Sequence, residues 1–124
     1  MADAYRDLIA WRKATPQALH IYRSTQKFPK DELYGLTSQM RRAAVSVASN
    51  MAEGKGRYSR KEFVQFLYHT RGSLTELETQ LFIARELNYF ETAEAQRIEH
   101  QAVELGRILN GLTMSIQKAS NASR

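Results

Sequence analysis

The sequence contains no cysteine and only two prolines, Pro16 and Pro29, among its 124 residues. The lack of cysteine excludes disulfides, thiolate zinc sites, iron–sulfur clusters and thiol catalysis, and it agrees with a reducing compartment. No stretch is apolar for long enough to cross a membrane, and no apolar run follows a basic start as it would in a secretory signal. We therefore expect a soluble, cytoplasmic protein with no membrane partner.

The sequence also lacks the motifs that mark common catalytic and cofactor sites. It has no phosphate-binding glycine loop, no nucleophile elbow and no pair of histidines at metal-binding spacing. His20, His69 and His100 fall in three different segments, and Glu76 and Glu78, two residues apart, do not share a helical face. We predict that the protein is not an enzyme and binds neither a metal nor a cofactor.

Helical periodicity dominates the sequence instead. Two C-terminal segments carry apolar residues at alternating spacings of four and three, the pattern of knobs-into-holes packing. The two seams are Phe63, Leu67, Thr70, Leu74, Leu77, Leu81 and Ala84, and Ile98, Ala102, Leu105, Leu109, Leu112, Ile116 and Ala119. Two amphipathic stripes precede them, namely Leu8, Trp11, Thr15, Leu19 and Tyr22, and Leu33, Leu36, Met40, Ala44, Val47 and Met51.

Short connections between these segments predict an all-α, antiparallel up-down-up-down four-helix bundle. We expect one domain over residues 1–124, with helices at about 5–27, 33–53, 60–87 and 93–118. Ser59 and Glu62 form a capping box for the third helix, and Asn88 is a left-handed stop. Gly54 is expected to end the second helix with a positive φ, and Pro16 should kink the first helix.

The second and third helices carry more small and apolar residues than the core of a single bundle needs. Small side chains cover most of the second helix, at Ala43, Ala44, Ser46, Val47, Ala48 and Ser49, and three apolar residues lie off the third seam, at Phe66, Phe82 and Ile83. Apolar surface that remains after the bundle closes favours self-association. The alternative is a wide core stripe within one chain, because globular helices commonly bury more than two positions per heptad.

The charge is unevenly distributed. Residues 1–61 contain 12 Lys or Arg and 5 Asp or Glu, a net charge of +7, whereas residues 62–124 contain 6 and 8, a net charge of −2. This asymmetry indicates that a polyanion or an acidic protein approaches the first half. The alternative is that the basic half pairs with the acidic half of the same chain.

The strongest candidate site is a basic cluster, Lys55, Arg57, Arg60 and Lys61, with Tyr58 inside it. It covers a glycine-containing connection and the first turn of the third helix, where backbone amides add to the positive field. Such a cluster suits phosphate contacts that depend on salt and tolerate many sequences, and Tyr58 suits stacking on a base. The alternative is a solvated turn that is basic for solubility.

A second candidate group is Arg41, Arg42 and Arg71. If the hairpin folds symmetrically at residues 54–58, Arg41 and Arg71 lie at a similar height on adjacent helices. Guanidinium groups bind phosphates and carboxylates equally well. The alternative to nucleic-acid contact is pairing with Glu76 or Glu78, within one chain or between chains.

One stretch carries a family resemblance. Residues 34–57 read YGLTSQMRRAAVSVASNMAEGKGR, and this run resembles the signature of the 23S rRNA intervening-sequence protein family, bacterial four-helix bundles encoded within large-subunit ribosomal RNA genes. Further matches are Asp7-Leu8 with Trp11, Phe28-Pro29, residues 59–63, and residues 72–78. Two departures are Pro16, in a helix usually free of proline, and Ala48, where many relatives carry proline.

The resemblance implies an antiparallel bundle that assembles as a ring-like homopentamer and binds RNA or a nucleoprotein partner. A distant branch is similar to the accessory proteins of diversity-generating retroelements. Together with the basic cluster, this predicts a non-enzymatic, oligomeric RNA-binding protein. The competing hypothesis is a protein–protein scaffold, or an accessory subunit, that makes no contact with nucleic acid.

Overall fold

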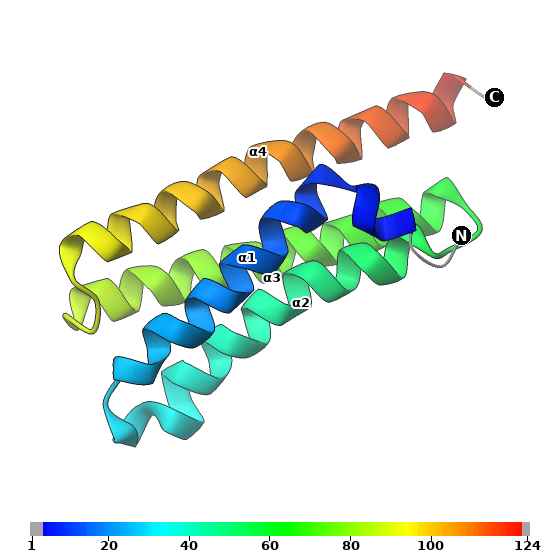
Figure 1. Cartoon of the computed structure of the whole chain (residues 1–124). Coiled ribbons are helices and arrows are strands. Elements are labelled where there is room, and N and C mark those ends of the chain that lie inside the picture. Colours follow the sequence, from blue (N-terminus) through cyan, green and yellow to red (C-terminus); the bar gives the residue numbers. More distant parts are fainter. Residues whose placement is uncertain (1–3, 123–124) are drawn as a thin grey trace.

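The computed structural model describes residues 4–122. Within that range the chain forms four α-helices, α1 (Ile9–Ser24), α2 (Ser38–Lys55), α3 (Arg60–Glu86) and α4 (Thr92–Ala122). Short 3-10 turns flank α1 at Ala4–Asp7, Thr25–Lys27 and Lys30–Glu32, and a wider helical turn, Leu33–Thr37, leads into α2. Successive helices run in opposite directions (Figure 1). The fold is an all-α four-helix bundle, which confirms the prediction.

The helices pack in a square, with α1 and α3 on opposite corners. Both α1 and α3 contact α2 and α4, and the most extensive contact is between α2 and α3. The start of α1, the α2–α3 connection and the end of α4 lie at one end of the bundle (Figure 1). No helix within residues 4–122 combines the length and the apolar character needed to cross a membrane.

The core lies along the seams predicted for α3 and α4. Leu67, Leu74 and Leu77 of α3 are fully shielded from solvent, and so are Ile98 and Leu109 of α4. Burying one such side chain contributes about 2 kcal/mol relative to leaving it exposed. The seams therefore supply the main force that holds these two helices in the bundle.

Toward the end of α4 the predicted seam is less deeply buried. Leu112 and Ile116 are only partly buried, and Ala119 is exposed. The sequence pattern continues there, but α1 begins at Ile9 and offers little surface beyond that point. The last turns of α4 therefore depend less on tertiary packing than the middle of the helix does.

The core face predicted for α1 is wrong over the second half of the helix. Leu19 and Tyr22 point outward and are 55% and 43% exposed, whereas Leu8 and Trp11 are partly buried and pack against the core. The buried residues are instead Ala10, Ala14, Gln17, Ile21 and Ser24, which have the same alternating spacing of four and three. Small side chains at Ala10 and Ala14 let α1 approach its neighbours closely, so packing distance, not side-chain size, decides which face is buried.

Helix α1 also begins later than predicted. Residues 4–7 form a separate 3-10 turn, and Leu8 has the extended backbone angles φ −71° and ψ 123°. An extended residue cannot continue a helix, so α1 starts at Ile9. Pro16 lies inside α1, and helical residues continue on both sides of it.

Helix α2 buries a wide face. Met40, Val47 and Met51 are fully buried as predicted, and Ala43 and Ala48 are buried beside them. This agrees with the wide core stripe that the sequence offered as an alternative for the small residues of this helix. Phe82 and Ile83 of α3, in contrast, remain 54% and 44% exposed.

The Ser59 half of the predicted capping box and the left-handed Asn88 are confirmed, whereas the predicted end of α2 at Gly54 is wrong. The Ser59 hydroxyl accepts a hydrogen bond of 3.1 Å from the Glu62 N–H, and Asn88 has φ 61°. Gly54 does not end α2, because the helix continues to Lys55 and no glycine in residues 4–122 has a positive φ. A Cβ on Gly54 would lie 2.5 Å from the Cβ of Phe66, so glycine is needed for close packing of α2 on α3.

Candidate nucleic-acid interface

The basic cluster occupies the α2–α3 connection at one end of the bundle. We call Lys55, Arg57, Tyr58, Arg60 and Lys61 the basic loop; all five are exposed, and the Tyr58 side chain is as exposed as in an extended chain. Lys55 is the last residue of α2, and Arg60 is the first of α3. Backbone bonds from the Gly56 N–H to the Ala52 oxygen (3.3 Å) and from the Arg57 N–H to the Gly54 oxygen (3.1 Å) shape the turn.

Two of these cations rest on aromatic rings of α3. The Arg57 guanidinium lies 4.8 Å from the centroid of the Phe66 ring, and its Nη2 is 2.9 Å from Oε1 of Glu53. The Lys55 Nζ lies 5.6 Å from the centroid of Phe63. These contacts are exposed to solvent, so each contributes less than about 1 kcal/mol, but they orient the charged groups.

Arg60 connects the basic loop to the far end of the chain. Its Nη1 donates a hydrogen bond of 3.3 Å to the Ala119 oxygen in the last turns of α4. Lys118 therefore lies at this end of the bundle as well, and the turn that carries Arg6 is also found here (Figure 1). We did not predict Lys118 or Arg6 as part of the site. The predicted topology contained the signal, because an up-down-up-down bundle places both chain ends beside its second connection.

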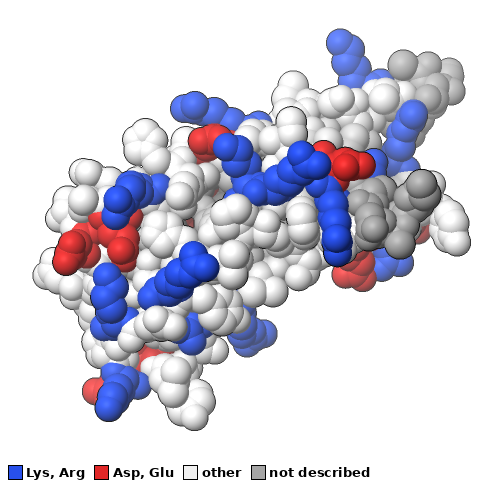
Figure 2. Space-filling model, viewed as in Figure 1, with Lys and Arg blue, Asp and Glu red and all other residues white. Residues whose placement is uncertain are grey.

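Positive charge does not cover the whole of the face seen in Figure 2. Figure 2 shows Lys and Arg side chains spread over the visible face, with acidic side chains between them. Lys13 of α1 pairs with Glu104 of α4 at 3.0 Å, and Lys27 pairs with Glu94 at 3.6 Å. The basic first half is therefore partly neutralised by the acidic second half, as the alternative reading of the charge asymmetry proposed.

The structure does not bring Arg41 and Arg71 together. The hydroxyls of Ser46 and Ser73 are 2.9 Å apart, so Ser46 and Ser73 are level across α2 and α3. Arg71 is then level with residue 48, seven residues or about 10 Å along the axis from Arg41. The predicted shared height is wrong because the α2–α3 connection extends beyond the end of α2 and is not a symmetric turn at residues 54–58.

Each of these arginines has its own surroundings. Arg41 faces the end of α1: its Nε donates to Oγ1 of Thr25 (2.9 Å), its Nη2 donates to the Tyr22 oxygen (3.2 Å), and it stacks 4.8 Å from the Tyr22 centroid. Arg71 lies over Gly106 of α4, with its Nη1 3.5 Å from Oε1 of Glu78. The predicted alternative of pairing with Glu78 therefore holds for Arg71.

Arg42 differs from both because its side chain is exposed. It lines a groove on the outer side of the α2–α3 pair together with Gln39, Ala43, Ser46, Ser73 and Glu76. The groove lies several helical turns from the basic loop. Of the eight residues predicted to contact nucleic acid, five therefore form one surface, and Arg41, Arg42 and Arg71 lie elsewhere.

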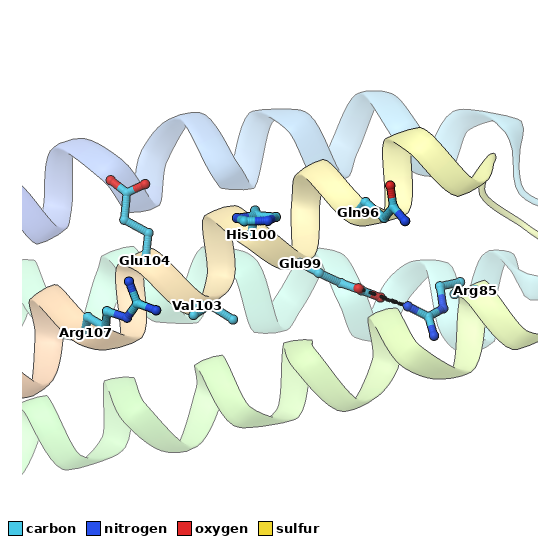
Figure 3. A pocket seen from close by; sticks show the side chains of 7 residues that line it. All are labelled: Arg85, Gln96, Glu99, His100, Val103, Glu104 and Arg107. Atoms are coloured by element: carbon cyan, nitrogen blue, oxygen red, sulfur yellow. Dashed lines mark hydrogen bonds and ion pairs between the residues drawn. The ribbon is translucent and has the colours of Figure 1, made fainter.

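A second groove follows the outer side of α4. It is lined by Arg85, Gln96, Glu99, His100, Val103, Glu104 and Arg107. Arg85 Nη1 donates to both carboxylate oxygens of Glu99 at 3.0 Å, and the other side chains are spread along the helix without converging on one point (Figure 3). No group of three His, Asp or Glu side chains within residues 4–122 is arranged to hold a metal ion.

Comparison with known proteins places this bundle in a family. Residues 6–111 match the model of the 23S rRNA-intervening sequence protein family. The chain belongs to this family. The match covers most of the sequence and includes the basic loop and all of α1, α2 and α3.

A solved relative supports the fold. The crystal structure of a protein with unknown function from the S23 ribosomal protein family of Bacteroides thetaiotaomicron aligns with a TM-score of 0.76 over 85% of this chain and 98% of that one. The two sequences are 18% identical, so the likeness shows a shared bundle and nothing about activity. Among curated proteins, none matches the sequence. The 23S rRNA-intervening sequence protein family is not a known enzyme family.

Proposed function

We propose that this member of the 23S rRNA-intervening sequence protein family is a non-enzymatic, oligomeric bundle that binds RNA, free or within a nucleoprotein, through its basic loop. The observation that carries the proposal is the exposure of four cations on either side of Tyr58 in the sequence of the α2–α3 connection, together with the full exposure of Tyr58 itself. The last turns of α4, which carry Lys118, adjoin the basic loop through the hydrogen bond from Arg60 to the Ala119 oxygen. The family match supports the proposal because the family is named for its place within ribosomal RNA genes.

The chemistry of the loop suits the RNA backbone and unpaired bases. One guanidinium nitrogen of Arg57 donates a hydrogen bond to Glu53, and its other N–H groups can donate to phosphate oxygens. Phosphate contacts position a protein on RNA without reading its sequence, whereas a stacked aromatic ring favours unpaired bases. We therefore propose that the preferred target is a stem with an adjoining single-stranded segment.

Assembly is part of the same proposal. In a homopentamer, which the sequence resemblance implies, five basic loops would be repeated around one axis. Repeated contacts raise the effective concentration of each loop after the first has bound, so weak individual contacts can give tight overall binding. Light scattering of the purified protein gives the number of copies, and a mass equal to one chain contradicts this part of the proposal.

A charge-reversal experiment tests the RNA interface. Binding to a stem-loop RNA with a single-stranded tail is measured by fluorescence anisotropy at several salt concentrations. The test variant reverses four charges of the basic loop, as Lys55→Glu, Arg57→Glu, Arg60→Glu and Lys61→Glu. We expect at least a tenfold loss of affinity at low salt. We also expect a shallower salt dependence, because each lost phosphate contact removes about 0.7–0.9 from the slope of log K against log salt.

A matched variant controls for net charge. It reverses four exposed cations at the opposite end of the bundle, as Arg23→Glu, Lys27→Glu, Lys30→Glu and Arg97→Glu. Both variants shift the net charge from +5 to −3. If the two variants lose affinity equally, the attraction is unspecific and the basic loop is not the interface. The proposal also fails if the unaltered protein does not bind RNA at low salt.

The competing function is a scaffold that holds a partner protein without nucleic acid. The observation that favours it is the exposure of Phe82 and Ile83 on α3, together with Val103 on α4. Pull-downs of the tagged protein before and after nuclease treatment separate the two functions. A partner retained after nuclease supports the scaffold, and a partner released by nuclease supports RNA binding.

A further inference from the structure

Helices α2 and α3 lie side by side, and both lack acidic residues over a long stretch (Figure 1). Residues 38–52 of α2 and residues 63–75 of α3 contain three arginines and no Asp or Glu. The stretch ends at Glu53 near the basic loop and at Glu76 farther along α3. An anion that lies along the α2–α3 pair therefore meets no carboxylate of these two helices between Glu53 and Glu76, so its approach is not opposed by like charge.

A groove between the two helices lies at the end of this stretch that is far from the basic loop. We call it the polar groove; it is lined by Gln39, Arg42, Ala43, Ser46, Ser73 and Glu76. The Arg42 side chain is exposed, and no hydrogen bond or ion pair within residues 4–122 involves it. Its guanidinium donors are therefore all available to a ligand, and their planar arrangement matches the oxygens of a phosphate.

The two serines of the polar groove hold a hydroxyl hydrogen that no protein group accepts. Asn50 Nδ2 donates to the Ser46 oxygen and to Ser46 Oγ, each at 2.9 Å. The hydroxyls of Ser46 and Ser73 are 2.9 Å apart, so one of them donates to the other. This contact uses one of the two hydroxyl hydrogens, and no acceptor within residues 4–122 binds the second. A phosphate oxygen beside Arg42 is a suitable acceptor for it.

Glu76 is the acidic side chain that lines the polar groove. Its Oε1 accepts a hydrogen bond of 3.2 Å from Nε2 of Gln80, a buried residue one turn farther from the basic loop. The carboxylate is therefore held from the side that faces away from the basic loop. An anion that reaches Arg42 from the basic loop meets the two serines before it meets Glu76.

Aromatic rings on α3 connect the basic loop to the polar groove. The Arg57 guanidinium lies on the ring of Phe66, and the exposed ring of His69 follows, with its centroid 6.2 Å from that of Phe66. Ser73 lies one turn beyond His69. The path from Phe66 along α3 to Ser73, and from there across to Arg42 on α2, covers about 16 Å along the helix axes. An imidazole ring, like a phenyl ring, is a surface on which an unpaired base stacks.

We propose that the single-stranded segment of a bound RNA follows this path from the basic loop to the polar groove. Arg42 and the free serine hydroxyl bind a phosphate there, and a base between the two phosphate sites stacks on His69. The inference rests on the proposed RNA-binding function and adds the course of the strand and a second phosphate site.

A single strand fits this path better than a duplex does. The basic loop lies at the end of the bundle, whereas the polar groove lies on its side, so the bound segment has to turn over the edge between them. Unpaired nucleotides make such a turn freely, whereas bending a duplex sharply costs energy. The base-paired stem therefore stays at the basic loop, and the adjoining single strand continues along α2 and α3.

A series of RNA tails tests the path with the variant Arg42→Glu. The stem-loop RNA carries single-stranded tails from none to about ten nucleotides long, and binding is measured by fluorescence anisotropy at low salt. We expect the affinity of the unaltered protein to rise with tail length. Arg42→Glu should lose about fivefold in affinity for the long-tailed RNA and little for the RNA without a tail, because only a long tail reaches the groove.

Arg23→Glu is the matched control. It replaces an exposed arginine near the opposite end of the bundle and changes the net charge equally, from +5 to +3. It should lose less than about twofold in affinity at every tail length, because distant exposed charges are screened. If Arg42→Glu loses no more than Arg23→Glu, or loses equally with and without a tail, the path is wrong and the basic loop remains the interface. If the unaltered protein binds no stem-loop RNA, the proposed function fails and the path fails with it.

The double variant Ser46→Ala, Ser73→Ala tests the phosphate site without a change of charge. It should lower the affinity for the long-tailed RNA by about threefold, the effect of one lost hydrogen bond, and leave the affinity for the RNA without a tail unchanged. Circular dichroism checks that the variant is folded. An affinity for the long-tailed RNA equal to that of the unaltered protein overturns the phosphate site in the polar groove.

Photo-cross-linking locates the strand directly. One photoreactive thiouridine is placed in the tail, either next to the stem or far from it, and the cross-linked protein is digested with trypsin. Cleavage after Lys and Arg releases residues 43–55 of α2 and residues 62–71 of α3 as separate peptides. The thiouridine far from the stem should cross-link to these two peptides. Cross-links that are confined to peptides of α1 or α4 overturn the proposal.

Discussion

Gly54 of α2 lies directly against Phe66 of α3: a Cβ on Gly54 would be 2.5 Å from the Phe66 Cβ, closer than two carbon atoms can approach. The contact lies in the last turn of α2, one residue before its end at Lys55, and sets the height at which α2 meets α3. Phe66 also carries the Arg57 guanidinium on its ring. The close approach of two backbones and the placement of a candidate phosphate-binding group therefore depend on one aromatic residue.

We expect Gly54→Ala to lower the free energy of unfolding by about 1–3 kcal/mol. Alanine has the higher helix propensity, but its methyl group overpacks the contact with Phe66, and overpacking costs more than the propensity gains. Urea unfolding followed by circular dichroism measures the change. Gly111→Ala is the control and should be stabilising, since nothing lies within 4 Å of that position. A stabilised Gly54→Ala variant would contradict the close approach.

Tyr58→Ala tests whether the ring at the tip of the basic loop stacks on a base. Stacking of one base contributes about 1–3 kcal/mol, so the affinity for a stem-loop RNA with a single-stranded tail should fall by about 5- to 150-fold. Stability should change by less than about 0.5 kcal/mol, because the Tyr58 side chain makes no buried contact. Tyr34→Ala, at a side chain 93% exposed near the other end of the bundle, should leave RNA affinity unchanged. Equal affinity of the two variants would count against stacking.

The sequence predicts the bundle correctly because α3 and α4 bury large residues. Large apolar side chains such as Leu74 and Leu109 are stabilised by burial and are fully buried here, so their spacing identifies the buried face. The same reasoning fails in α1, where Ala10 and Ala14 are buried and Leu19 is exposed. Hydrophobic size predicts burial only when the helices are far enough apart to hold large side chains, and the sequence does not give that distance.

The candidate site is predicted in part for a similar reason. The basic loop is contiguous in sequence, so its members stay together wherever the connection lies. Arg41 and Arg71 come from different helices, and their relative height depends on how far the α2–α3 connection extends past α2. That register is fixed by packing, as in the contact between Ser46 and Ser73, and no local pattern encodes it.

Arg41 should act in stability and not in RNA binding. It donates to Thr25 and to the Tyr22 oxygen and stacks on the Tyr22 ring, which ties α2 to the end of α1. We expect Arg41→Ala to lower the free energy of unfolding by about 1–2 kcal/mol. Arg41→Lys should recover little of this loss, because an ammonium lacks the planar donors. RNA affinity measured on the folded variants should match that of the unaltered protein. A loss of affinity without a loss of folding would show that Arg41 contacts RNA, against this prediction.

The contact between Tyr89 and Glu32 predicts a loss of stability at alkaline pH. The Tyr89 hydroxyl donates a hydrogen bond of 2.9 Å to Oε2 of Glu32. Ionised Tyr89 could not donate this bond and would face the Glu32 carboxylate, so the contact raises the pKa of Tyr89 above its usual value. The native structure therefore favours the protonated phenol.

Linkage gives the sign of the pH effect. Because the pKa is higher in the folded than in the unfolded state, the contact contributes fully below about pH 10, the ordinary tyrosine pKa, and its contribution falls as the pH rises through the folded-state pKa. Tyr89→Phe removes the contact, so the variant should be less stable than the unaltered protein at pH 8. The difference between their urea midpoints, which we call the stability gap, should narrow at pH 10.5 and above. Urea midpoints at several pH values measure the gap. Tyr34→Phe, at an exposed ring, should show a gap near zero throughout; a constant gap for Tyr89→Phe would mean that Glu32 does not bind the phenol in solution.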